Sequence, residues 1–114
     1  MKLSFADTMI NAKDYKTLVQ FYLSVANFEI DLESDLYTLL KDPVTSQVLC
    51  ICNGSPLSST GPGFKTSDFD ASLASAKALG STLIHQGANQ DKSFQYAAFE
   101  DPEGNPFLIW FGEH

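Results

Sequence analysis

Hydrophobic residues recur at helical spacing in two segments of the chain, and an aspartate precedes each segment. Asp14 stands before the first segment, and Asp68 stands before the second. An aspartate side chain accepts hydrogen bonds from the first free backbone N–H groups of a helix, so both residues are predicted N-caps. Gly80 suits the left-handed position that follows a helix C-terminus. The apolar stripe of the first helix consists of Tyr15, Leu18, Val19, Tyr22, Val25 and Ala26.

Short apolar runs divided by turn residues surround the two helical segments. Ser34-Asp35 and Asp42-Pro43 are such dividers. Runs of this length with aromatic and branched residues predict β-strands. The predicted strands are Leu3–Asn11, Phe28–Leu32, Leu36–Leu40, Gln47–Cys52, Phe64–Ser67, Thr82–His85, Phe94–Phe99 and Phe107–Phe111.

The chain repeats itself once. Aligning Asp14 with Asp68 matches apolar with apolar positions throughout, in the pairs Tyr15/Phe69, Val19/Leu73, Val25/Leu79 and Ile30/Ile84. Each half reads strand, helix, three strands, which is the order βαβββ. With 114 residues, of which 44% are hydrophobic, the chain is long enough for one domain with a modest core. We therefore expect a single domain over residues 1–114, with module one at 1–53, a Gly/Pro/Ser/Thr-rich linker at 54–63 and module two at 64–114.

A polar turn followed by a buried strand closes the chain. Asp101-Pro102 opens the turn, and Gly104-Asn105 supplies positions that tolerate positive φ. Together with the repeat, this D-P-E-G-N turn resembles the closing hairpin of the vicinal-oxygen-chelate superfamily, which includes glyoxalase I, extradiol dioxygenases and bleomycin-resistance proteins. The resemblance covers almost the whole chain. It implies an α+β fold of two tandem βαβββ modules with curved sheets and helices outside, the glyoxalase/bleomycin-resistance fold, and a homodimer that covers open sheet edges.

The metal-dependent enzymes of that superfamily hold a divalent ion with His and carboxylate side chains at four strand positions. In this chain the resemblance assigns those positions to Asp7, to Leu49 or Cys50, to Pro62 and to Leu108. Only Asp7 carries a clear ligand for a hard metal. The expectation is therefore a protein without a bound metal and without a cofactor.

The cup that the resemblance implies would be aromatic and would hold one carboxylate. Because side chains alternate along a strand, Leu108 facing the cup brings Trp110 to the same side, while Phe107, Ile109 and Phe111 face the helices. The same rule places Thr66 on the cup side with Phe64. The predicted ligand-binding residues are Phe5, Asp7, Met9, Phe64, Leu108 and Trp110. Such a cup resembles the drug-binding branch of the superfamily, with Trp110 stacking on an aromatic or cationic ligand and Asp7 pairing with its charge.

Composition and charge limit the kinds of binding partner and the cellular compartment that we expect for this protein. A formal charge of −7, from 14 acidic and 7 basic residues, argues against nucleic acid as a partner. The sequence has neither a membrane-spanning apolar run nor a secretory segment, so we expect no membrane partner and a cytoplasmic protein. Cys50 and Cys52 have a spacing unsuited to a mutual disulfide and are predicted to be reduced core thiols.

Two other functions stay open at this point. The first is a metal-free or atypical enzyme of the superfamily, a lyase, isomerase or oxygenase, in which burial raises the pKa of Asp7 and makes it a general base. The second is an interaction module with a filled cup. His85 is interpreted as an ordinary strand residue, and His114 as a frayed end or a tag remnant.

Overall fold

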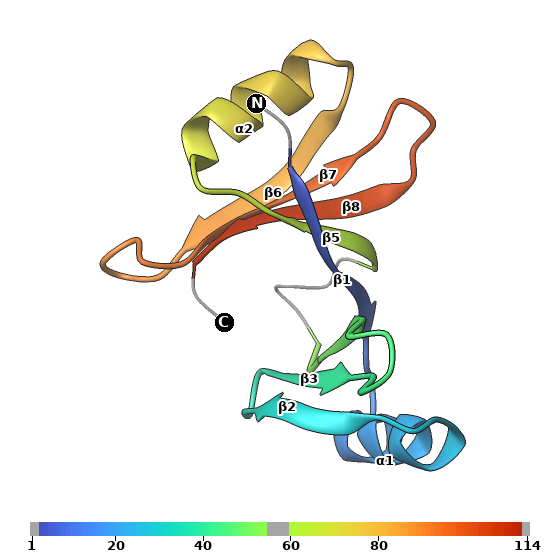
Figure 1. Cartoon of the computed structure of the whole chain (residues 1–114). Helices are drawn as coiled ribbons and strands as arrows, with labels where there is room; N and C mark the ends of the chain where they lie inside the picture. Colours follow the sequence, from blue (N-terminus) through green and yellow to red (C-terminus); the bar gives the residue numbers. More distant parts are fainter. Residues whose placement is uncertain (1–2, 55–59, 113–114) are drawn as a thin grey trace. The chain divides into compact units, whose positions relative to one another are not determined.

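A computed structural model describes residues 3–54 and 60–112 of the chain. These residues form two helices and eight strands in the order βαβββ-βαβββ, so the predicted α+β fold is confirmed (Figure 1). The elements are β1 (Ser4–Asn11), α1 (Tyr15–Val25), β2 (Glu29–Glu33), β3 (Tyr37–Lys41), β4 (Val48–Cys52), β5 (Gly61–Lys65), α2 (Phe69–Ala78), β6 (Thr82–Ala88), β7 (Gln95–Glu100) and β8 (Pro106–Phe111). None of the helices in the described ranges is long and apolar enough to cross a membrane.

The chain divides into two compact units. The unit called here the first half comprises Asp7–Thr60, and the second half comprises the residues from Gly61 onward together with the start of the chain up to Ala6. The division falls inside β1, so one strand contributes to both units. The predicted boundaries of module and linker stay a prediction, and residues 55–59 of that linker lie outside the described residues.

The first half is a sheet with α1 on one face. Its strands follow the order β2-β3-β4-β1, with β1 parallel to β4 and the other neighbours antiparallel. Ala12, Val19, Leu40 and Ile51 form the buried cluster between α1 and the sheet. Asp14 caps α1 as predicted, since its Oδ1 accepts a hydrogen bond from the Thr17 N–H at 3.5 Å.

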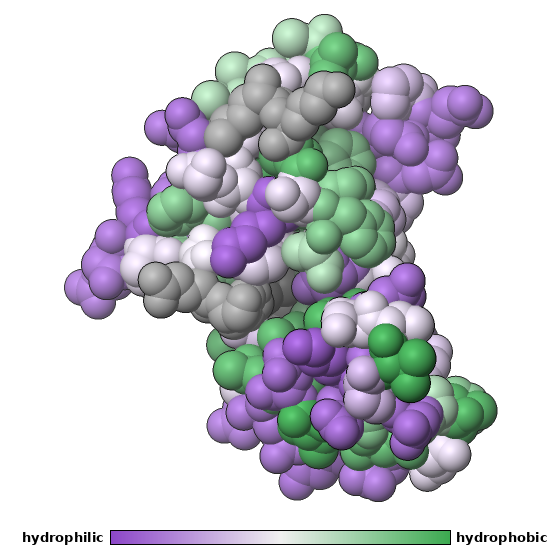
Figure 2. All heavy atoms as spheres, viewed as in Figure 1, coloured by the Kyte–Doolittle hydropathy of each residue, from purple (hydrophilic) through white to green (hydrophobic). Residues whose placement is uncertain are grey.

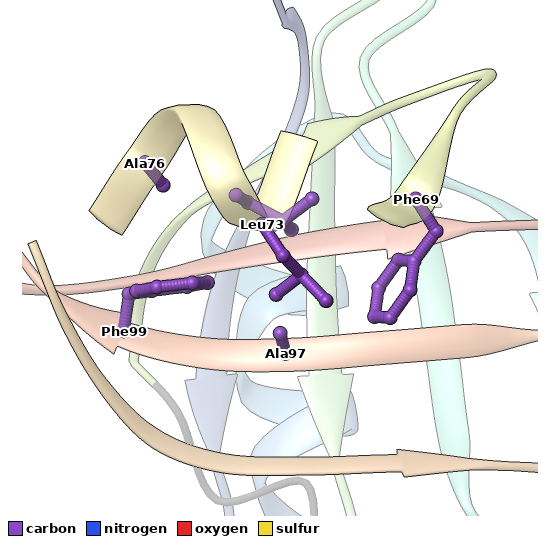
Figure 3. Close-up of a cluster of buried hydrophobic side chains, with 6 residues drawn as sticks. Phe69, Leu73, Ala76, Ala97 and Phe99 are labelled. Atoms are coloured by element: carbon purple, nitrogen blue, oxygen red, sulfur yellow. The ribbon is translucent and has the colours of Figure 1, made fainter. Parts of the chain in front are cut away.

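The second half repeats this arrangement with α2. Its strands follow the order β5-β8-β7-β6, with β5 parallel to β8. Phe69, Leu73 and Ala76 of α2 point down onto Ala97 and Phe99 of β7, and Ile109 completes the cluster (Figure 3). Asp68 caps α2 through the Ala71 N–H at 3.2 Å. Both helices therefore begin where the sequence pattern predicts.

Two strands extend three residues beyond a predicted end. β5 begins at Gly61, although Gly61, Pro62 and Gly63 were assigned to the linker. Gly and Pro weaken a strand, and they are tolerated at its first residues. β6 continues past His85 to Ala88 through Gly87. Gly80 has a φ of +98°, which confirms the predicted left-handed residue after α2.

Candidate functional site

The sheet face of the second half that points away from α2 carries the predicted site residues Leu108 and Trp110. Ile109 lies in the α2 cluster, and Phe107 and Phe111 pack against it, so the predicted alternation along β8 is confirmed. Strand register then fixes the neighbours on the other side. The face, called here the Trp110 face, consists of Gly63, Lys65, Thr82, His85, Gly87, Tyr96, Ala98, Glu100, Pro106, Leu108 and Trp110.

Lys65 lies directly over Trp110. The two residues are register partners on β5 and β8, and the Lys65 Nζ is 5.2 Å from the centroid of the indole ring. Trp110 is only 5% exposed. The protein's own ammonium group therefore holds the position that the sequence analysis assigned to a cationic ligand. Ligand binding by Leu108 and Trp110 stays a prediction.

Tyr96 and His85 form a hydrogen-bonded pair on the same face. Tyr96 is the register partner of Trp110 on β7, and its hydroxyl lies 2.9 Å from the Nε2 atom of His85. Burial raises the pKa of Tyr96. Gly87 makes room for this tyrosine, because a Cβ at Gly87 would lie 2.7 Å from the ring atom Cε1. The tyrosine ring is thus held in one place by a missing side chain and a hydrogen bond.

Sequence reasoning missed Lys65, Tyr96 and His85 as neighbours of Trp110. The signal for Tyr96 was present, because the turn between β7 and β8 fixes their register. In that turn the Asp101 N–H donates to the Asn105 carbonyl oxygen at 2.8 Å, and Glu100 pairs with Pro106. Counting back from this pair places Tyr96 opposite Trp110. No comparable local turn links Lys65 to β8, because parallel strands are joined by distant chain segments.

The predicted placement of Phe64 and Thr66 on the Trp110 face is wrong. Phe64 is the register partner of Ile109, and its ring contacts Phe107 at a centroid distance of 6.0 Å. Thr66 hydrogen-bonds to Ser72 of α2. Both side chains therefore lie on the α2 side. A shift of one residue in a strand exchanges its two faces, and here Lys65 takes the predicted place.

Phe5 contacts Phe64 and belongs to a different unit from Asp7. It belongs to the second half, is 64% exposed and meets the Phe64 ring edge to face at 5.6 Å. Asp7 and Met9 belong to the first half. The six predicted ligand-binding residues are therefore divided between the two units, with Asp7 and Met9 in one. Their joint role in binding a ligand stays a prediction.

Among the described residues of the first half, Asp7 is the one deeply buried carboxyl group. It is 5% exposed, and its Oδ1 has no hydrogen-bond partner among residues 3–54 and 60–112. Burial raises the pKa of Asp7 from 3.8 to about 6. Buried polar atoms are normally hydrogen-bonded, so an unpaired carboxylate oxygen at this depth requires an explanation.

The sheet face of Asp7 carries sulfur-containing and apolar side chains next to it, and Asn11 and Tyr37 lie farther along the same face, opposite Cys52. Met9 follows two residues later on β1 and is the register partner of Cys50 on β4. Cys50 and Cys52 are buried and free, as predicted, with their Sγ atoms 3.9 Å apart. The contact with Cys52 and burial raise the pKa of the Cys50 thiol. These groups offer Asp7 little solvation.

The donor set does not fit the divalent metal of the superfamily's enzymes. Of the four positions assigned by resemblance, Leu108 is apolar and Pro62 lies in β5 without a ligand atom. The position on β4 is either the apolar Leu49 or Cys50, a buried free thiol. Within the described ranges, no three side chains of His, Cys, Asp or Glu lie close enough together to hold a metal ion. The absence of a bound metal stays a prediction. His114, which was interpreted from the sequence as a frayed end or a tag remnant, lies outside the described residues.

Solved structures with the same fold include enzymes. A methylmalonyl-CoA epimerase variant from Streptomyces coelicolor, in complex with 2-nitronate-propionyl-CoA, has 16% identity, a TM-score of 0.71 and coverage of 99% of this chain and 100% of its own. The Mycobacterium tuberculosis epimerase has 13% identity and a TM-score of 0.70 over 97% of this chain and 89% of its own. A hypothetical protein from Bacillus halodurans has 11% identity and a TM-score of 0.73 over 100% and 97%.

No protein-family model matches the sequence, and no curated protein matches it. The similarity to solved structures is therefore one of fold, and it extends over the whole chain. It confirms the fold that the predicted resemblance implied. The chain has the glyoxalase/bleomycin-resistance fold.

Proposed function

We propose that this protein is an enzyme that removes and returns a proton at a carbon next to a carbonyl group, with Asp7 as the base. The observation that carries the proposal is the buried Asp7 oxygen without a hydrogen-bond partner in the described part of the chain. A carboxylate that only supports the fold would be paired, whereas a base must keep a lone pair available for its substrate.

The pKa of Asp7 suits this chemistry. A carboxyl group with a pKa of about 6 is mostly ionised at neutral pH and is a stronger base than an exposed aspartate. In the proposed step the Asp7 carboxylate takes the proton, and the electrons of the C–H bond move onto the carbonyl oxygen to form an enolate. Return of the proton gives an epimer or an isomer. The fold neighbours that are epimerases support this class of reaction.

Hydrogen–deuterium exchange tests the proposal directly. The chain is incubated in D2O with a panel of α-substituted acyl thioesters that includes methylmalonyl-CoA, and loss of the α-proton signal is followed by NMR. We expect the exchange rate to rise with pH through about 6, because Asp7 must be ionised to accept a proton. Asp7→Asn should reduce the rate by about 100-fold or more.

Asp31→Asn is the matched control, because Asp31 lies exposed on β2 of the same half. It removes one carboxylate and should leave the rate unchanged. An exchange rate that is equal in Asp7→Asn and in the parent chain, or no exchange with any member of the panel, would refute the proposal.

Binding without turnover, the function first expected from the sequence, is the second candidate. The observation that favours it is the pair of buried rings on the Trp110 face, Trp110 and Tyr96, which are 5% and 8% exposed. Aromatic side chains of this kind commonly line small-molecule sites. A small molecule that binds to the parent chain and shows no α-proton exchange would support this function over catalysis.

A further inference from the structure

The sulfur-containing side chains of this protein gather on one sheet face of the first half. The sequence has two cysteines and two methionines. Met9 of β1 is the register partner of Cys50 of β4, and Cys52 lies two residues further along the same strand. Side chains two residues apart on a strand point to the same face. Three of the four sulfur atoms therefore occupy adjacent places within one compact unit.

The two thiols are spaced for one metal ion between them. Their Sγ atoms are 3.9 Å apart, far beyond the roughly 2.0 Å of a disulfide bond. A thiolate sulfur holds a first-row metal ion at about 2.3 Å. With both bonds at that length, sulfur atoms 3.9 Å apart subtend an angle of about 116° at the ion. This angle is close to that of a trigonal plane, so the pair needs little movement to chelate a three-coordinate ion.

Met9 supplies a third sulfur beside this pair. Neighbouring strands lie about 4.8 Å apart, and the methionine side chain has three rotatable bonds, so its thioether can reach an ion held by Cys50. The register partner of Cys50 on the other side is Leu39, which has no ligand atom. The ligands that the sheet offers around Cys50 are therefore two thiols and a thioether.

Burial and donor type both favour a soft ion. Met9, Cys50 and Cys52 are 4%, 5% and 1% exposed, so an ion between them would have no shell of water. Magnesium and calcium prefer oxygen ligands, whereas thiolate and thioether sulfur select Cu(I). A zinc site of the usual four ligands does not fit, because no group of three His, Cys, Asp or Glu side chains in the described part of the chain could hold a metal ion.

The charges around the thiols also favour a cation. The contact with Cys50 lowers the pKa of the Cys52 thiol, while burial and the Asp7 carboxylate raise it. Asp7 raises the pKa of Cys50 as well, after the contact with Cys52 and burial. A positive ion bound to the sulfur atoms offsets the repulsion between these anionic groups.

We infer that the first half binds one Cu(I) ion through the Cys50 and Cys52 thiolates and the Met9 thioether. Binding breaks two S–H bonds, forms two copper–thiolate bonds and releases two protons to water, with no change in the oxidation state of copper or sulfur. Copper binding goes beyond the proposed function and does not depend on it. It departs from the expectation, drawn from the sequence, that both cysteines are core thiols in a protein without a bound metal.

Competition for Cu(I) under nitrogen measures the binding. The reduced chain is loaded with Cu(I) both in the folded state and during refolding from urea, because the sulfur atoms are buried, and is then dialysed against the chelator bicinchoninate. We expect one copper ion to stay with each chain and to give a thiolate-to-copper absorption band in the ultraviolet. X-ray absorption should show three sulfur neighbours at about 2.3 Å.

Substitutions of the three ligands test each role. Cys50→Ser and Cys52→Ser should each weaken Cu(I) binding at least about 100-fold, since even residues that only orient metal ligands contribute about 10–100-fold. Met9→Leu keeps the size of the side chain and removes the thioether, so it should weaken binding about tenfold and leave two sulfur neighbours. Because it keeps both thiols, Met9→Leu tests the site even if a cysteine variant does not fold.

Ile51→Val is the matched control. Ile51 lies between the two cysteines on β4, and its side chain is buried in the α1 cluster on the opposite face. The substitution trims a core side chain of the same strand without touching a sulfur atom. It should bind Cu(I) like the parent chain.

Complete removal of copper from the parent chain by the chelator would overturn the inference. So would zinc binding as tight as copper binding, X-ray absorption with oxygen or nitrogen neighbours alone, or unchanged copper binding in Cys50→Ser, Cys52→Ser or Met9→Leu. Proton exchange of the acyl thioesters is measured on the copper-free chain, so its absence refutes the catalytic role of Asp7 alone. Failure to bind copper leaves that role intact.

Discussion

Asp7 is a carboxyl group that the fold keeps out of water, and this position costs stability. Its pKa in the folded chain is about 6, against 3.8 for an ordinary aspartate. Between these two values the folded state holds a proton that the unfolded state has lost. Stability from this group is therefore complete below about pH 4 and is lost as pH rises to about 6.

Asp7→Asn should remove this loss. The asparagine side chain has the shape of the protonated aspartate and cannot ionise, so the variant should be more stable than the parent at pH 7 by up to about 3 kcal/mol. At pH 4 the two chains should be similar. Urea unfolding between pH 4 and pH 8 measures the difference.

The control for this prediction is again Asp31→Asn, since Asp31 is exposed and should follow the parent at every pH. If the stability difference between Asp7→Asn and the parent stayed constant from pH 4 to pH 8, the raised pKa of Asp7 would be wrong. If Asp7 is a catalytic base, Asp7→Asn should be more stable than the parent and should lose proton exchange, because active-site residues often lower stability in favour of function.

At the scale of elements, an aspartate N-cap fixes the start of each helix. Asp68 accepts a hydrogen bond from the Ala71 N–H at 3.2 Å, and Asp14 accepts one from the Thr17 N–H at 3.5 Å. A longer bond is a weaker one. Both halves therefore cap their helix with an aspartate, and the cap hydrogen bond of α2 is the stronger of the two.

Removing each cap should show this difference. Asp68→Ala should lower the free energy of unfolding by about 1 kcal/mol, and Asp14→Ala should lower it by less. Chemical denaturation of both variants makes the comparison, and Asp68→Ser, which keeps a capping oxygen, should lose much less than Asp68→Ala. An equal loss for Asp68→Ser and Asp68→Ala would show that the cap is not the cause.

The sequence was sufficient to predict features that depend on contacts within a short stretch of the chain. The Asp caps, the start of the apolar stripe of α1 and the turn at Asp101–Asn105 depend on residues close together in the chain, and the structure confirms them. The end of the predicted stripe is wrong, because Val25 is 63% exposed and Ala26 is also exposed. The face of β5 depends instead on its parallel partner β8, more than 40 residues away, as the pairing of Lys65 with Trp110 shows. Its Gly61-Pro62-Gly63 start also conceals a strand, so the sequence assigned Phe64 to the wrong face.

The candidate site was predicted in part for the same reason. Alternation along one strand correctly put Leu108 and Trp110 on one face and Phe107 and Ile109 on the other. The partners of Trp110 come from three other strands, and only β7 is joined to β8 by a turn that fixes its register. Lys65 and His85 therefore required the structure. The unpaired oxygen of Asp7 also required it, because a missing hydrogen bond leaves no pattern in a sequence.

At the scale of the whole molecule, the expected homodimer stays a prediction, and its surface can now be specified. Two copies of a chain with a formal charge of −7 repel each other, so they should meet where charge is absent. Hydrophobic and hydrophilic residues are intermixed on the surface in view (Figure 2). One apolar hollow in the second half has no charged residue in its lining, which includes Leu3, Phe64, Leu79 and Phe107.

Leu79 and Phe5 make this hollow a suitable contact for a second copy. Leu79 is 77% exposed at its edge, and Phe5, 64% exposed, packs on Phe64. Covering such side chains in a dimer gains about 1.5–3 kcal/mol for each one that is fully buried. We expect a dimer in light scattering after size exclusion at micromolar concentration. Higher salt should strengthen it, because salt screens the repulsion between the two acidic chains.

Leu79→Gln and Phe5→Gln should shift the protein toward monomer, since each replaces an apolar contact with a polar one and leaves the net charge unchanged. Val44→Gln is the matched control, because Val44 is 85% exposed in the turn between β3 and β4 of the first half. It should keep the dimer. A parent chain that stays monomeric at micromolar concentration would rule out the dimer. A dimer that Val44→Gln dissociates as readily as Leu79→Gln would place the interface away from the hollow at Leu79.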